Sequence, residues 1–301
     1  MPRNADILVH HPARPVDLRG ATLALLISML WGGNPVAIKL GLRDAPPLRL
    51  AALRFVLGGA AVALWAWATG RLAGLRVAPG DLRPLAVVGF LFIVQIATMN
   101  VGTHLTSAAH SAILLNLYGV HTVVLAHFLI PGDRLSARKV AGALVAYGGI
   151  VLLFGRQLSV GAPTLAGDAI MVLSSIALGL RTVYMARIVQ RLDPVIVLLS
   201  QIVVGVVVFV ALSWLLEPAA TRWTPGLALT LAYQGLVVAG FNFVVNLWLL
   251  QRYRPSALAG FFLSQPIFGV LAAALVVGDP LTPDLLAASV AVAVGIGLTS
   301  R

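Results

Sequence analysis

Gly132-Asp133-Arg134-Leu135 recurs 146 residues later in the chain as Gly278-Asp279-Pro280-Leu281. The match extends over most of the sequence in two registers that differ by one residue: residues 76–152 match 222–298, and residues 20–67 match 167–214. The matched positions include residue types that seldom align by chance, among them Gly32/Gly179, Pro47/Pro194, Trp67/Trp214 and Asn100/Asn246. A repeat of this length indicates that the chain consists of two related halves.

Hydrophobic residues make up 59% of the 301 residues and charged residues only 10%, whereas a soluble domain carries about 25% charge. The composition therefore predicts a protein embedded in a lipid bilayer. Most of its apolar segments approach the roughly 20 residues with which a helix crosses the hydrocarbon. The segments lie at about 21–40, 50–69, 85–104, 108–130, 140–155, 168–187, 195–216, 227–250, 256–277 and 285–299. We expect an all-α membrane protein with ten transmembrane helices.

Basic residues are distributed unevenly over the two sides of such a protein. With ten spans, 14 of the 21 Lys and Arg residues lie on the side of the termini, 6 lie on the opposite side, and Arg181 lies within a span. Because cytoplasmic loops carry the excess of Lys and Arg, we expect both termini in the cytoplasm, on the inner (plasma) membrane of a bacterial-type cell. The net charge of +11 then reflects topology and contact with membrane lipids, and no nucleic-acid partner is expected.

An odd number of spans in each half makes the second half enter the membrane from the opposite side. We therefore predict two inverted five-helix repeats, residues 20–155 and 167–301, after a cytoplasmic tail at residues 1–19. Inverted repeats are typical of transporters that expose a midplane site to each side in turn. The polar and kink-forming residues predict that segments 1, 3, 4, 6, 8 and 9 line this site, in a largely apolar cavity with few fixed charges.

Several short motifs resemble the drug/metabolite transporter superfamily, specifically its EamA type. They are Trp31-Gly32-Gly33-Asn34 followed by Lys39, Pro46-Pro47, Arg54-Phe55, and the two Gly-Asp turns at 132–135 and 278–281. The resemblance covers nearly the whole chain, although both turns have Asp where the family usually has Glu. It implies two five-helix repeats and a transport function. Within the family, the chain is similar to bacterial exporters of aromatic amino acids, the YddG type.

None of the ten acidic residues falls in the middle of a predicted span. Asp168 and Asp284 open segments 6 and 10, where a carboxylate stabilises the positive end of the helix dipole. This distribution disfavours a proton antiporter that depends on a buried carboxylate, and it favours facilitative transport. Because a histidine can still carry a proton, histidine-linked antiport of drugs or other metabolites stays open as an alternative.

Segment 4 has the richest polar face in the chain. Helical spacing places His110, Tyr118 and His121 on one side of it. Tyr118 and His121 are candidates for substrate contact, the tyrosine by stacking on an aromatic group. The alternative is that the histidines form hydrogen bonds between helices. They lack the spacing of metal ligands, and the chain contains no cysteine, so no metal site is expected.

Segment 1 has a proline, Pro35, that removes a helix hydrogen bond and can kink the helix. Trp31, one turn earlier, can stack on a flat ligand beside the kink, whereas tight packing is the alternative interpretation. Pro266 supplies a break in segment 9. Pro35 and Pro266 are not at equivalent positions of the two repeats, so the two gates of the transporter need not be symmetric.

Other polar residues within the spans complete the set of substrate-binding candidates: Asn34, Gln95, Asn100, Arg181, Tyr184, Asn242, Asn246 and Gln265. Each has an alternative. Asn100 and Asn246 are repeat mates that can form a symmetric interhelical hydrogen bond, and Arg181 either binds a substrate carboxylate or extends to the membrane interface. We expect Lys39 and Arg54 near the outer ends of their spans, extending to the interface or pairing with Asp44.

These features predict an inner-membrane exporter of small metabolites, most of all amino acids with aromatic or large hydrophobic side chains. We expect no cofactor, and a monomer or weak dimer. The short loops hold no cluster of His, Asp and Glu of the kind that an enzyme of lipid chemistry needs. The chain is therefore not expected to be an enzyme.

Overall fold

The computed structural model describes residues 16–72, 75–130, 134–160, 164–189, 191–250, 253 and 261–299. All regular secondary structure in these residues is helical, which confirms the all-α class. The helices are α1 (Leu18–Gly32), α2 (Asn34–Gly41), α3 (Pro47–Ala68), η1 (Pro79–Asp81), α4 (Leu82–Leu105), α5 (Ala108–Asn116), α6 (Tyr118–Leu129), α7 (Ala137–Val160), α8 (Leu165–Ile188), α9 (Pro194–Leu216), α10 (Pro225–Ala232), η2 (Tyr233–Phe241), α11 (Asn242–Leu250), α13 (Gln265–Ala272), η3 (Ala273–Val277) and α14 (Pro283–Thr299).

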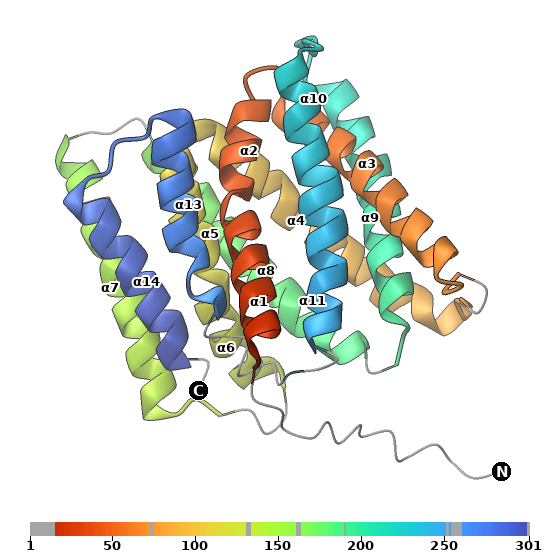
Figure 1. The fold of residues 1–301 in the computed structure, drawn as a ribbon, viewed down its shortest axis with the longest axis horizontal. Helices are drawn as coiled ribbons and strands as arrows, with labels where there is room; N and C mark the ends of the chain where they lie inside the picture. Colours follow the sequence, from red (N-terminus) through yellow and green to blue (C-terminus); the bar gives the residue numbers. More distant parts are fainter. Residues whose placement is uncertain are drawn as a thin grey trace.

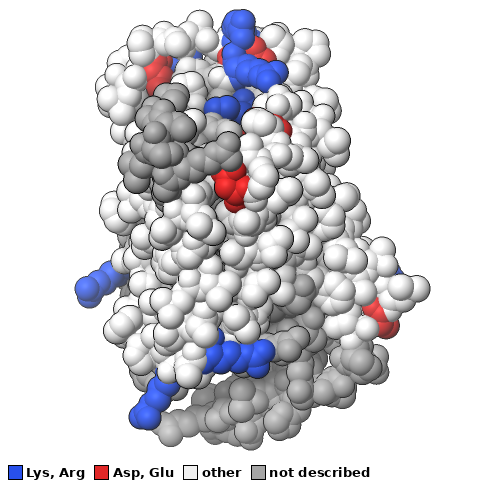
Figure 2. Space-filling model, turned by 90° about the vertical axis from the view of Figure 1, so that its left-hand side faces the viewer, with Lys and Arg blue, Asp and Glu red and all other residues white. Residues whose placement is uncertain are grey.

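Helix coincides with at least part of every segment that the hydropathy predicts (Figure 1). Among the described residues, six helical stretches are long and apolar enough to cross a membrane: Leu18–Gly41, Pro47–Ala68, Pro79–Leu105, Ala108–Leu129, Leu165–Ile188 and Pro194–Leu216. Shorter apolar helices follow in the second half of the chain. On the face that Figure 2 shows, charged side chains lie toward the two ends, and most of the surface between them is uncharged. This surface suits a multi-pass membrane protein.

The last helices of the two halves, α7 and α14, pack against each other (Figure 1). A Cβ atom added at Gly142 would lie 2.7 Å from the carbonyl oxygen of Gly295, and one at Gly149 would lie 3.3 Å from the Cα atom of Ala288. The two helices therefore run antiparallel. With the repeat offset of 146, Gly142 corresponds to Ala288 and Gly149 corresponds to Gly295. The contact of Gly142 with Gly295 is therefore the repeat equivalent of the contact of Gly149 with Ala288. A two-fold axis perpendicular to the helices has this effect.

A second pair of repeat-equivalent helices, α3 and α9, is also packed antiparallel. Near the start of α3, Arg49 Nε donates a hydrogen bond to Ser213 Oγ, late in α9, at 3.0 Å. Further along α3, a Cβ atom added at Gly59 would lie 2.8 Å from Cγ2 of Ile202, which is early in α9. Equivalent helices of the two halves thus point in opposite directions.

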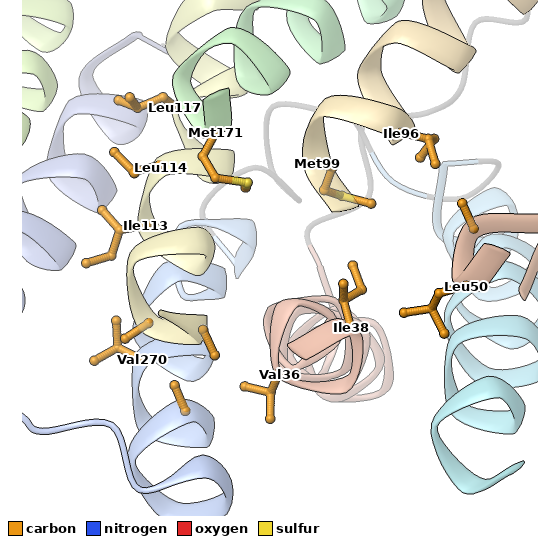
Figure 3. Close-up of a cluster of buried hydrophobic side chains, with 14 of the residues drawn as sticks. Val36, Ile38, Leu50, Ile96, Met99, Ile113, Leu114, Leu117, Met171 and Val270 are labelled. Atoms are coloured by element: carbon orange, nitrogen blue, oxygen red, sulfur yellow. The ribbon is translucent and has the colours of Figure 1, made fainter. Parts of the chain in front are cut away.

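Buried apolar side chains surround α2 in the core of the bundle. Val36 and Ile38 of α2 are 4% and 0% exposed. Figure 3 shows Ile38 pointing toward Leu50 of α3, with Met99 of α4 and Val270 of α13 near other sides of the same helix. Because lipid tails are as apolar as these side chains, close packing rather than transfer out of water stabilises this core.

Three of the predicted segments are broken within the membrane region. Segment 1 breaks at Gly33, between α1 and α2, just before Pro35. Segment 4 breaks at Leu117, between α5 and α6, although it contains no proline. Segment 9 has a turn at residues 263–264 ahead of α13. With the offset of 146, Leu117 corresponds to residue 263, so the break near Pro266 has its equivalent in segment 4 and not at Pro35.

Substitution of Gly142 by leucine tests the contact between α7 and α14. The new side chain has no space beside Gly295, and overpacking of this kind typically costs about 1–3 kcal/mol. We expect a lower melting temperature of the purified protein in detergent. Gly148→Leu is the matched control in the same helix, because a Cβ atom there meets nothing within 4 Å. Equal melting temperatures for both variants would contradict the packing described here.

Candidate functional site

A cavity of about 280 Å³ lies where the three broken segments meet α3, α4, α8 and η2. This volume is close to the lower end of the usual range for small-molecule sites, so it suits a small metabolite. The residues that line the cavity are Trp31, Asn34, Pro35, Arg54, Gln95, Ile96, Met99, Leu115, Asn116, Tyr118, Leu178, Arg181, Val238 and Gln265.

Six of the eleven substrate-binding candidates lie in this lining. They come from six different helices or breaks and are Trp31, Asn34, Gln95, Tyr118, Arg181 and Gln265. The structure thus brings together residues up to 234 positions apart in the sequence. Asn116 and Arg54 join them, although the sequence pattern did not indicate either residue as a candidate. The second span, which carries Arg54, was not among the segments expected to line the site.

Two candidates outside the lining, Asn100 and Asn242, donate hydrogen bonds to backbone carbonyl oxygens. Asn100 Nδ2 donates to the carbonyl oxygen of Ile96 at 2.9 Å within its own helix. Asn242 Nδ2 donates to the carbonyl oxygen of Ile27 in α1 at 3.4 Å. Both side chains are 0% exposed, so their amides connect or stabilise helices here and do not face the cavity.

His121 is also outside the lining, as are Tyr184 and Asn246. Nδ1 of His121 lies 3.1 Å from Oγ of Ser175 in α8, and its ring packs 5.7 Å from that of Tyr147. This is the interhelical hydrogen bond that the sequence left open as an alternative. Tyr184 lines a separate hollow near the end of α8, and Asn246 is partly exposed in α11.

The break in segment 1 is stabilised from the opposite half of the chain. Tyr233 Oη in η2 donates a hydrogen bond of 2.6 Å to the carbonyl oxygen of Leu30. A Cβ atom on Gly33 would lie 2.8 Å from that hydroxyl, so glycine allows the tyrosine to approach. Trp31 beside the break lies edge to face on Phe262, with 5.9 Å between ring centroids. The aromatic wall of the cavity is therefore held in place by contacts between the halves.

The sequence predicted Arg54 at the outer end of its span, and this prediction was wrong. The helix begins at Pro47, so Arg54 is two turns inside it, and only 6% of the residue is exposed. Its Nη1 donates to Oε1 of Gln234 at 3.3 Å, and Nε2 of Gln234 donates to the carbonyl oxygen of Ala37 at 3.3 Å. The expected partner, Asp44, pairs with Arg222 at 2.9 Å.

Two arginines therefore face one cavity, and both lie on aromatic rings. The Cζ atom of Arg54 is 4.5 Å from the ring centroid of Phe55, and that of Arg181 is 5.3 Å from the ring centroid of Phe92. The two rings pack edge to face with centroids 4.8 Å apart. Aromatic faces attract guanidinium groups by cation–π interactions, so the paired rings position both cations beside the cavity.

A network of polar contacts connects several helices at one end of the bundle. Lys39 Nζ donates to the carbonyl oxygens of Thr103 and His104, each at 3.0 Å, and so caps the C-terminus of α4. Nδ1 of His110 lies 3.0 Å from Oδ2 of the buried Asp168, which opens α8. Lys39 was expected to extend outward or pair with Asp44. Instead it fastens α2 to α4, and His110 fastens α5 to α8.

Comparison with known proteins gives consistent matches over the whole chain. The EamA-like transporter family matches at residues 18–155 and 165–301. The "Probable amino-acid metabolite efflux pump" of Salmonella typhimurium is 26% identical over 91% of this chain and 92% of its own. The "Uncharacterized transporter YoaV" of Bacillus subtilis is 21% identical over 90% and 92%. A solved crystal structure that is 20% identical has a TM-score of 0.67, with 93% of this chain and 96% of that chain covered, so the fold is shared.

Proposed function

Because the chain belongs to the EamA-like transporter family, we propose that it exports small metabolites, with amino acids favoured, by alternating access around the 280 Å³ cavity. It is a multi-pass inner-membrane protein, and a transporter rather than an enzyme. The observation that carries the proposal is the position of the cavity. It lies where broken helices meet, and irregular backbone at membrane depth is tolerated where it is buried in protein or lines a cavity.

For the topology, we propose ten crossings in two inverted repeats, residues 20–155 and 167–301, with both termini in the cytoplasm. Two observations support the inversion: α7 runs antiparallel to α14, and α3 runs antiparallel to α9. Helices that occupy equivalent places in the two halves can point in opposite directions only if an axis in the membrane plane relates the halves. Such an axis produces two related gates around a shared site.

The six candidates that line the cavity are the proposed substrate-binding residues, together with Arg54 and Asn116. Trp31 and Tyr118 offer apolar and aromatic surface, which favours substrates with an aromatic or large hydrophobic side chain. Arg54 and Arg181 offer guanidinium groups to a carboxylate, for which bidentate hydrogen bonding is typical. The name of the Salmonella relative, an amino-acid metabolite efflux pump, is consistent with a substrate that has both features.

Export in this proposal is facilitative and is not coupled to protons. Within the described chain, no residue that lines the cavity is acidic, and none is a histidine. The His110–Asp168 pair belongs to the network at the end of the bundle. The second candidate function, export of drugs or other metabolites by histidine-linked proton antiport, is favoured only by the presence of that pair, in which Asp168 is buried.

Substrate counterflow into proteoliposomes tests the proposal. Vesicles are preloaded with a mixture of unlabelled amino acids and supplied with labelled phenylalanine, tryptophan or threonine. We expect uptake of the two aromatic amino acids and little uptake of threonine, because the cavity combines guanidinium groups with aromatic side chains. Empty vesicles are the control. Absence of uptake for all three amino acids would refute the amino-acid assignment.

Replacing Tyr118 by alanine should lower the counterflow of phenylalanine about tenfold, equivalent to ~1.4 kcal/mol of lost aromatic contact. Tyr184→Ala is the matched control, since Tyr184 is a tyrosine of a membrane helix that does not line this cavity. Rates are normalised to monodisperse protein. If both variants transported at the same rate, Tyr118 would have no role in binding.

An imposed pH gradient should change the counterflow rate by less than about twofold, because no titratable carboxylate or imidazole of the described chain lines the cavity. The measurement compares vesicles with equal and with different internal and external pH. A strong acceleration in the gradient that disappears in the His110→Gln variant would establish the proton antiporter instead.

A further inference from the structure

The charge of the cavity is the observation that leads beyond this proposal. We propose that the cavity carries organic anions of charge −1 or −2 with at least one carboxylate in preference to zwitterions, and that the membrane potential drives their export. The inference rests on the proposed transport through this cavity, and it places organic anions ahead of the amino acids favoured above.

The two cavity arginines carry permanent charge, since a guanidinium group stays protonated in proteins. Nε of Arg54, and Nε and Nη1 of Arg181, are buried without a hydrogen-bond partner among the described residues. An unpaired cation inside a membrane is costly, and such groups usually mark a substrate or ion pathway. An anion that enters the cavity would supply the compensating charge.

No acidic side chain of the described chain compensates this charge within the cavity. Five carboxylates of the described chain have partners elsewhere. Asp17 accepts from Tyr253, Asp44 binds Arg222, and Asp168 binds His110. Glu217 accepts from the amides of Leu48 and Arg49, and Asp279 accepts from the amide of Ala109. The two guanidinium groups thus give the lining a formal charge of +2.

Charge balance separates an anion from a zwitterion. Asn34 and Gln95 line the cavity, and side-chain amides are groups that can accept hydrogen bonds from the ammonium group of an amino acid. These acceptors are neutral, however, and a zwitterion would leave the charge of the occupied cavity at +2. A monoanion lowers it to +1 and a dianion to zero. Because charge in a low-dielectric site is weakly screened, the anions are favoured.

The guanidinium groups are held where one substrate can meet both. Gln234 fixes Arg54 by a hydrogen bond, and the packed rings of Phe55 and Phe92 lie under Arg54 and Arg181, respectively. Tyr118 and Trp31 line the same cavity. An aromatic ring with one or two carboxylates, and without an ammonium group, matches this lining.

Such a substrate would need no proton coupling to leave the cell. The inside of the membrane is negative, so each negative charge that moves outward gains free energy from the potential. At 100 mV, this gain corresponds to an outward concentration ratio of roughly 50-fold per charge. A zwitterion gains nothing from the potential. The two arginines and the lack of carboxylates in the described lining then both serve the export of anions by the membrane potential.

Four labelled compounds with the same phenyl ring test the proposal in wild-type proteoliposomes: phenethylamine (+1), phenylalanine (0), phenylpyruvate (−1) and phenylsuccinate (−2). Efflux is measured with potassium and valinomycin clamping the potential at zero or negative inside. We expect the two anions to leave at least tenfold faster than phenylalanine at zero potential, and the negative interior to accelerate only the anions. Phenylalanine efflux equal to or faster than that of both anions would overturn the inference and leave the transport function standing. Absence of efflux for all four compounds would overturn the proposed function itself.

Arginine variants add a second test. Removing a charged hydrogen-bond donor in Arg54→Gln or Arg181→Gln should slow phenylpyruvate efflux about 10- to 100-fold, with a smaller effect on phenylalanine. Arg71→Gln is the control, because Arg71 lies outside the cavity, over Trp65. Each variant must be monodisperse in detergent. If a variant does not fold, the comparison of the four compounds in the wild-type protein still tests the proposal. Unchanged anion efflux in both folded variants would overturn the proposal.

Discussion

A break in a membrane helix leaves backbone N–H and C=O groups without hydrogen-bond partners in a medium that contains no water. The centre of this protein depends on the side chains that supply partners at one such break. Near the break at Gly33, the hydroxyl of Tyr233 donates a hydrogen bond to the carbonyl oxygen of Leu30. Further along the same segment, Nε2 of Gln234 donates to the carbonyl oxygen of Ala37. Both donors come from η2 in the other half of the chain. The break can therefore exist only in the assembled protein.

The same contacts determine the electrostatics of the cavity. Gln234 bonds to Ala37 with its amide nitrogen and accepts from Arg54 with its amide oxygen, so one side chain connects the broken helix to a buried cation. η2 is a π-helical stretch of nine residues, and π-helical turns often occur at functional sites. Tyr233 and Gln234, adjacent in the sequence at the start of this stretch, donate to two different carbonyl oxygens of segment 1.

Close packing elsewhere gives this centre a rigid frame. Helices α7 and α14 approach through Gly142 and Gly295, and α3 and α9 are joined by the hydrogen bond from Arg49 to Ser213. At one end of the bundle, Lys39 and the His110–Asp168 pair connect four further helices. Polar residues of the described chain thus have two roles: some, such as Lys39 and His110, hold helices together, and others, such as Asn34 and Arg181, line the cavity.

The sequence by itself determined the membrane environment, the position of the apolar segments, the repeat and the family, because composition, hydropathy and repeated motifs are local properties of the chain. It also selected six residues that line the cavity. It misplaced Arg54, because a helix start at residue 50 instead of Pro47 moves the arginine by almost one turn, and it did not distinguish His121 from Tyr118, since both lie on the same helical face. Only the tertiary structure decided which polar groups point inward and which have partners, because both depend on what the neighbouring helices place beside each group. Around Arg54 and Arg181, the described part of the cavity lining contains no acidic side chain.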